Sequence, residues 1–130
     1  MSIVEHLGQF RVVIRRQDRS VEYLQIREQI ERYYQKGQEL YLKLAKDTVV
    51  PEDVQRFVAD EWVKPVTDYL KSTLGMRKAF YFLRVVPEPQ PDADSVAKFG
   101  YEKAIARARI RSRLERLRNF SAELHPGIYR

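Results

Sequence analysis

Cysteine is absent from this 130-residue sequence. The chain therefore forms no disulfide framework, no cysteine-ligated zinc site and no thiol nucleophile. Such a composition fits the reducing environment of the cytoplasm, and we expect a cytoplasmic protein.

Long apolar runs are also missing. The longest uninterrupted apolar stretch is Ala79–Leu83, far short of the roughly 20 residues that a membrane-spanning helix needs. The opening segment, MSIVEHLGQF, carries an acid and a histidine where a secretory signal would carry a continuous apolar run. We therefore expect a soluble protein that has no membrane partner.

The motifs of catalytic and metal sites are missing as well. The five glycines are scattered, so neither a dinucleotide-binding GxGxxG motif nor a phosphate-binding P-loop can form. An enzyme would have to use His6 or His125, which lie near opposite ends of the chain. Asp60 and Glu61 are adjacent, but consecutive helical residues point about 100° apart, which favours a solvated face over acid–base catalysis. We expect a non-enzymatic protein with no catalytic residue, no metal site and no cofactor.

The apolar residues that are present follow helical spacing. Apolar residues make up 44% of the sequence and aromatic residues 12%, which suffices for one domain with a hydrophobic core. Between residues 20 and 46 they recur alternately three and four positions apart, which predicts a long amphipathic helix capped by Ser20. Gly37 lies on this seam, where it either weakens the helix by up to ~1 kcal/mol or permits a close helix crossing. The seam comprises Tyr23, Ile26, Ile30, Tyr33, Gly37, Leu40 and Leu44.

A further helical region is predicted from Pro51 to Gly75. Proline is favoured in the first turn of a helix, so Pro51 marks its start. Pro65 lacks the amide hydrogen that a helix interior needs, which predicts a kink or a restart near Lys64.

Two segments, 3–16 and 76–86, fit either a helix or a strand. Ile3, Leu7, Phe10 and Ile14 are spaced as on a helix, whereas residues 10–15 also alternate as in a strand. We favour helices for both segments, with a short buried helix in 76–86. The alternative is an α+β fold with a small two-stranded sheet that pairs 9–15 with 80–86.

Residues 87–94, PEPQPDAD, form a predicted linker inside the domain. Three prolines in five positions favour extended backbone, after which Asp92, Asp94 or Ser95 can cap a last helix over 95–122. The complete pattern predicts an all-α single domain over residues 1–130, a compact bundle of about five helices. Its two long helices, 20–46 and 95–122, are expected to pack against each other.

The stretch RARIRSRLERLRN, residues 107–119, alternates arginines with other residues as a strand would. A helical seam through Ala106, Ile110, Leu114 and Leu117 extends well beyond this alternation, so we predict a helix. At about 100° per residue the arginines then border the seam on two flanks. The first flank is Arg107, Arg111 and Arg118, and the second is Arg109, Arg113 and Arg116.

Positive charge is concentrated in this part of the chain. Residues 98–118 hold eight basic and two acidic side chains, which accounts for the whole net charge of +6. Six of the eight are arginines, and arginine favours bidentate contact with phosphate or carboxylate. Three interpretations remain open: ion pairs with the chain's own acids, contact with a phosphate backbone, or contact with an acidic protein.

The leading hypothesis is a non-enzymatic accessory subunit of a nucleoprotein complex, which binds a DNA or RNA backbone without sequence specificity. In size, helicity and basic charge the whole chain resembles the small helical subunits of CRISPR effector complexes, which implies a place beside other protein subunits in a ribonucleoprotein complex. The alternative is an assembly or adaptor subunit that docks its arginine flanks on an acidic protein. Changing Arg109, Arg113 and Arg116 to Glu is expected to abolish binding while the fold survives. The candidate nucleic-acid-binding residues are Lys103, Arg107, Arg109, Arg111, Arg113, Arg116 and Arg118, aided by Arg11, Arg15 and Arg16.

Overall fold

The computed structural model describes the backbone of residues 3–46 and 51–124 and the side chains of residues 22–46 and 52–124. Every regular element in this part of the chain is helical, which confirms the all-α prediction and not the two-stranded alternative. Short 3₁₀ and π-helical segments, Pro51–Asp53 and Ala59–Val63, flank α2. The helices are α1 (Ile3–Lys43), α2 (Val54–Val58), α3 (Lys64–Leu74), α4 (Met76–Leu83), α5 (Ala93–Phe99) and α6 (Tyr101–Glu123).

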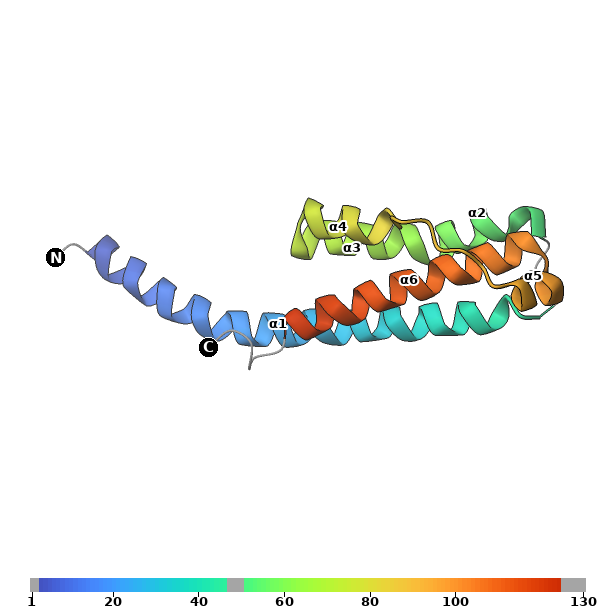
Figure 1. Cartoon of the computed structure of the whole chain (residues 1–130). Coiled ribbons are helices and arrows are strands. Elements are labelled where there is room, and N and C mark those ends of the chain that lie inside the picture. The colour runs from blue at the N-terminus through green and yellow to red at the C-terminus, as the bar shows by residue number, and fades with distance from the viewer. Residues whose placement is uncertain (1–2, 47–50, 125–130) are drawn as a thin grey trace.

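Helix α6 lies in the middle of the bundle. It runs along α1 on one side and meets α2 and α4 on the other, as Figure 1 shows. The predicted pairing of the two long helices is therefore confirmed. At 1.5 Å per residue the 41 residues of α1 span about 60 Å, so its N-terminal part extends beyond the end of the bundle (Figure 1).

Helix α1 is continuous where the sequence suggested a new start. A helix was expected to begin at Ser20, but α1 runs from Ile3 through Ser20 to Lys43 without interruption. Neither proline nor glycine occurs between Phe10 and Ser20, and the residues there are compatible with a helix interior. The helical interpretation of 3–16 is thus confirmed, whereas the side chains of Arg11, Arg15 and Arg16 lie outside the described residues.

The last predicted helix is divided in two. Gly100 adopts φ 84°, a left-handed conformation that favours glycine, and separates α5 from α6. Asp92 caps α5, because its Oδ1 accepts a hydrogen bond from the amide of Ser95 at 2.6 Å. A second glycine with positive φ, Gly75, separates α3 from α4, and these two helices form a hairpin (Figure 1).

The predicted irregularity at Pro65 is confirmed. Helix α3 starts at Lys64 with Pro65 in its first turn, directly after the π-helical segment Ala59–Val63. The missing amide hydrogen of proline is tolerated there because a first-turn amide has no partner inside its own helix.

Trp62 lies at the centre of the core. Its side chain is fully buried, its Nε1 donates to the carbonyl of Tyr33 at 2.8 Å, and its ring meets Phe82 edge to face. A Cβ atom on Gly37 would lie 2.8 Å from Trp62 Cε2 and 2.7 Å from Leu114 Cδ2, closer than atoms can pack. Gly37 therefore permits a close helix crossing, one of its two predicted roles.

Candidate functional site

Two arginines of α6 bind the C-terminal end of α4. Arg113 donates to the carbonyl oxygens of Phe82 and Leu83, at 3.3 and 2.9 Å. Arg116 donates to the carbonyl oxygen of Tyr81 and to those of residues 84 and 86, beyond the helix end. The last carbonyls of a helix have no partner inside the helix, so these arginines act as a C-terminal cap supplied by another helix.

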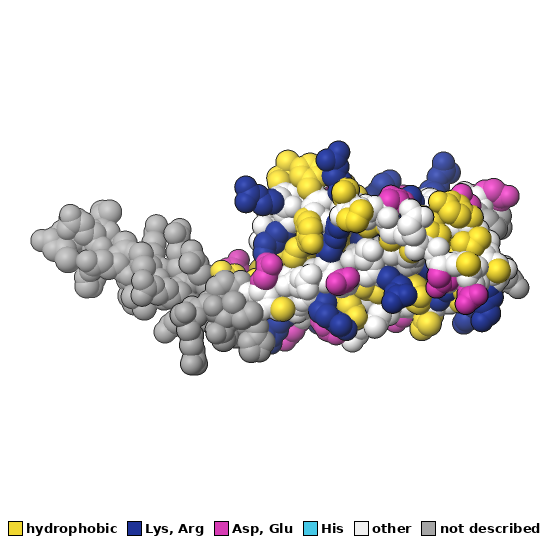
Figure 2. Space-filling model, viewed as in Figure 1, with side chains coloured by type: hydrophobic (Ala, Val, Ile, Leu, Met, Phe, Trp, Pro, Cys, Tyr) yellow, Lys and Arg dark blue, Asp and Glu magenta, His cyan; other side chains and the backbone are white. Residues whose placement is uncertain are grey.

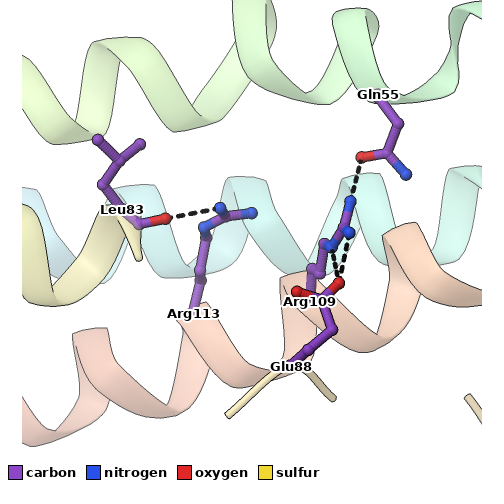
Figure 3. Close-up of polar contacts among 5 residues, drawn as sticks. All are labelled: Gln55, Leu83, Glu88, Arg109 and Arg113. Atoms are coloured by element: carbon purple, nitrogen blue, oxygen red, sulfur yellow. Dashed lines mark hydrogen bonds and ion pairs between the residues drawn. The ribbon is translucent and has the colours of Figure 1, made fainter. Parts of the chain in front are cut away.

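A third arginine fastens the linker to the bundle. Arg109 donates through Nε to Glu88 Oε1 at 2.8 Å and through Nη1 to Gln55 Oε1 at 3.1 Å, so it joins the linker to α2 (Figure 3). Its Nη2 also forms an ion pair with Glu88, a side chain that is about half exposed. We call Arg109, Arg113 and Arg116 the α4 flank, because they bind α4 and the linker that follows it.

The opposite flank of α6 contacts α1. Arg107 donates to the carbonyl of Tyr41 at 3.1 Å, and its guanidinium lies 3.9 Å from the centroid of the Tyr41 ring. Arg118 donates to the hydroxyl of Tyr34 at 2.9 Å. Lys103 is buried, and its Nζ donates to the carbonyl of Lys46 just beyond the end of α1. Basic side chains therefore satisfy carbonyls near the C-terminal end of α1 as well.

Arg111 differs from the other arginines of α6 in its lack of contacts within the described structure. Its side chain is exposed and makes no hydrogen bond or ion pair with the described residues. It acts at a distance on Asp92, whose pKa is lowered first by hydrogen bonds from Ser95 and then by the charges of Arg111 and Arg107. Of the six α6 arginines, Arg111 is therefore the one whose guanidinium makes no hydrogen bond or ion pair within the described part of the chain.

The α4 flank is a concentrated group of like charges. The pKa of Arg113 is lowered to about 10, chiefly by burial and further by the neighbouring charges of Arg109 and Arg116, while Glu88 opposes the shift. Carbonyl dipoles, rather than carboxylates, supply most of the compensation for this charge, because Glu88 is the one acid that pairs with the flank in the described structure.

The predicted site residues therefore do not form one basic surface. Lys103 and five of the six α6 arginines are engaged with α1, α2, α4 or the linker. The sequence suggested acids as their intramolecular partners, but main-chain carbonyls and tyrosine side chains take that role in most cases. These partners leave no signal in the sequence, since every residue has a carbonyl.

An apolar surface on α4 was missed by sequence reasoning. Residues 76–86 were expected to contain a buried helix, but only one side of α4 is buried, through Ala79 and Phe82. Met76, Phe80 and Leu83 are 52%, 51% and 38% exposed and follow one another four and three positions apart along one line of the helix. We call these three residues the α4 face.

Exposed basic residues lie in the same hairpin as this apolar line. The α3–α4 hairpin, residues 64–86, holds five basic side chains and a single acid, Asp68. Lys71, Arg77 and Arg84 are exposed and form no ion pair within the described residues. Figure 2 shows dark-blue basic side chains beside yellow apolar ones at the end of the molecule where α3 and α4 lie.

Among the residues described, no group of three or more histidine, cysteine, aspartate and glutamate side chains is placed to hold a metal ion. None of the described helices is both long enough and apolar enough to cross a membrane. No protein-family model, curated protein or solved structure matches the chain.

Proposed function

We propose that the protein is a non-enzymatic adaptor subunit of a larger assembly and that a protein partner docks on the α4 face. The observation that carries this proposal is the line of half-exposed Met76, Phe80 and Leu83 on a well-packed helix. Scattered single apolar residues are normal on a protein surface, whereas a contiguous set typically marks an interaction site.

The α4 face is also held in place from behind. Phe82, about 100° around the helix from Leu83, is fully buried against Trp62, and Arg113 and Arg116 cap the end of the helix. A partner would therefore meet a helix that is already ordered, so binding would not carry the free-energy cost of folding it.

Site-specific photo-crosslinking in the cells that express the protein natively tests the proposal. A photoreactive amino acid at position 80 or 83 should give a discrete adduct that protease removes and nuclease does not. The matched control is position 42, because Leu42 is a large apolar residue that is 63% exposed on α1, away from α4. The proposal fails if positions 80 and 83 give no protein adduct, or the same adducts as position 42.

A second candidate function is binding of a DNA or RNA backbone, as in the small subunits of CRISPR effector complexes. Three observations favour it: the net charge of +6, the basic α3–α4 hairpin, and a shallow groove in which Arg111 and Arg118 lie beside Tyr34. Such binding would be independent of sequence, because the groove offers guanidinium groups to phosphates and no element that enters a base-pair groove.

Titration with unrelated DNA and RNA oligonucleotides at several salt concentrations tests this second function. Backbone binding predicts a log–log slope of about −0.7 to −0.9 for each phosphate contacted. Arg77, Arg84 and Arg111 changed together to Glu should abolish it, since all three are exposed and make no hydrogen bond through their side chains in the described structure. Absence of binding at low salt, or unchanged affinity in this variant, would exclude the groove and the hairpin as the binding surface.

A further inference from the structure

We infer that the occupant of the α4 face is an amphipathic helix of a different protein, with acidic residues along the edge of its apolar stripe. This inference rests on the proposed adaptor function and adds the chemistry of the partner to it.

The shape of the α4 face matches a helix. Met76, Phe80 and Leu83 span two turns, a line about 10 Å long. A partner helix with apolar residues at positions i, i+3 or i+4, and i+7 presents a stripe of the same length and spacing. Strand addition needs an unpaired sheet edge, and no strand exists in the described part of the chain to offer one.

The basic residues beside the α4 face determine which charge the partner helix should carry. Arg77 lies in the first turn of α4, and Arg84 directly follows the helix, where its amide still donates to the carbonyl of Phe80 at 2.8 Å. Because the two are seven residues apart, they lie on the same edge of the helix, next to Phe80 at about 100° per residue. Both are exposed, and neither forms an ion pair with a described residue. Carboxylates on the edge of a docked helix would meet these two guanidinium groups directly, which favours an acidic partner over a neutral one.

A second copy of this chain does not fit the surface. Two α3–α4 hairpins placed face to face would each bring five basic residues and one acid, and like charges across an interface are unfavourable. The N-terminal segment of another copy carries the same sign, with four arginines between residues 11 and 19 and one acid, Asp18. Neither of these two segments of a second copy supplies the complementary charge, which favours a different protein as the partner.

Nucleic acid fits the α4 face less well than a helix does. Single-stranded nucleic acid binds to rows of aromatic rings on which its bases stack. Of the three residues of the α4 face only Phe80 has a ring, and Met76 and Leu83 are aliphatic. The other exposed ring of α4, Tyr81, already has the guanidinium of Arg116 4.3 Å from its centroid. Flexible apolar side chains of this kind pack instead into the apolar stripe of a protein helix.

Selection from a random peptide library displayed on phage, with the full chain as bait, tests the inference. The enriched peptides should be amphipathic when written as helices and should carry more acids than the starting library. A selected peptide should bind at least about tenfold more weakly to the Phe80→Gln variant and to the Arg77→Glu, Arg84→Glu double variant. Leu42→Gln is the matched control and should bind with unchanged affinity, and circular dichroism confirms that each variant is folded.

The outcomes separate the inference from the function on which it rests. Enriched peptides that are neutral or basic, or that bind equally to the Phe80→Gln variant, overturn the acidic helix. If a protein adduct still forms at position 80 in cells, the adaptor function stands with a partner of other chemistry. Binding of single-stranded oligonucleotides or of phosphatidylserine vesicles that is lost in Phe80→Gln, without any protein adduct, overturns both.

Discussion

Helices α6 and α4 use their side chains in opposite ways. Five of the six arginines in α6 hydrogen-bond to other parts of the described structure, whereas α4 exposes the three apolar residues of the α4 face, and Tyr81, to solvent. The most basic segment of the sequence is thus largely an internal component of the fold. Arginine can take this role because its stem packs against apolar surface while its planar head reaches several carbonyls at once.

The two helices are also coupled. The arginines that α6 directs inward cap the C-terminal end of α4, and so they hold the outward apolar line in position. Substitutions that break this coupling should have large effects on stability, while substitutions on the α4 face should affect binding and leave stability almost unchanged.

The largest effect is expected from charge reversal of the whole α4 flank. Arg109, Arg113 and Arg116 changed together to Glu would place three carboxylates against carbonyl oxygens and beside Glu88. An uncompensated charge at the buried Arg116 costs about 3–5 kcal/mol, and the more exposed Arg109 adds less. Since a domain of this size is stable by roughly 5–15 kcal/mol, this variant should lose its cooperative thermal transition in circular dichroism. A retained transition with an unchanged midpoint would show that the α4 flank does not stabilise the fold. That result would agree with the prediction from sequence, in which this variant loses binding and still folds.

Arg116→Ala should destabilise the protein by about 2–4 kcal/mol, because its buried guanidinium serves three carbonyl oxygens. Arg111→Ala, the matched change at the exposed arginine, should stay within about 0.5 kcal/mol of the parent. Urea unfolding measures both. Equal changes in the free energy of unfolding for the two substitutions would contradict the conclusion that the α4 flank stabilises the fold.

Gly37→Ala probes the other side of α6, where α1 crosses it. Alanine would raise helix propensity by about 1 kcal/mol, yet its Cβ would overlap Trp62 and Leu114, and overpacking costs about 1–3 kcal/mol. We expect net destabilisation in urea unfolding. Gln38→Ala, at an exposed neighbour on the same helix, is the control and should be neutral or slightly stabilising. Stabilisation by Gly37→Ala would mean that the crossing is looser than described.

The smallest effect is expected on the α4 face. Met76→Gln, Phe80→Gln and Leu83→Gln should each change the free energy of unfolding by no more than about 0.5 kcal/mol, since these side chains are already substantially exposed. Phe82→Ala is the contrasting change and should cost about 3–5 kcal/mol, because that ring is fully buried. The comparison between the two helices fails if the Gln variants unfold as readily as Phe82→Ala.

Much of the fold could be predicted because apolar spacing records which side of a helix is covered. The seam through Ile26, Ile30 and Leu40 is the buried side of α1, and the seam through Ile110 and Leu117 is the buried side of α6. The break at Gly100 could not be predicted, since glycine is compatible with a helix as well as with positive φ.

The candidate site was harder to predict than the fold. The flanks of α6 follow from helical geometry alone, but their partners depend on which neighbour packs beside each flank. The apolar residues of α4 cover one broad arc, with Ala79 and Phe82 on its buried side and the α4 face on its exposed side. Its sequence therefore indicates that one side is buried without indicating which.

The cap on α4 has a consequence for the order in which the protein is made. Arg113 and Arg116 follow the carbonyls of α4 that they bind by 30–35 positions along the chain. Because a ribosome synthesises the chain from its N-terminus, the α3–α4 hairpin emerges before the residues that complete it. Any nascent or truncated chain that ends before α6 presents the α4 face on a helix whose C-terminal end is still uncapped. The α4 face is therefore held on a fully capped helix only after α6 has been synthesised.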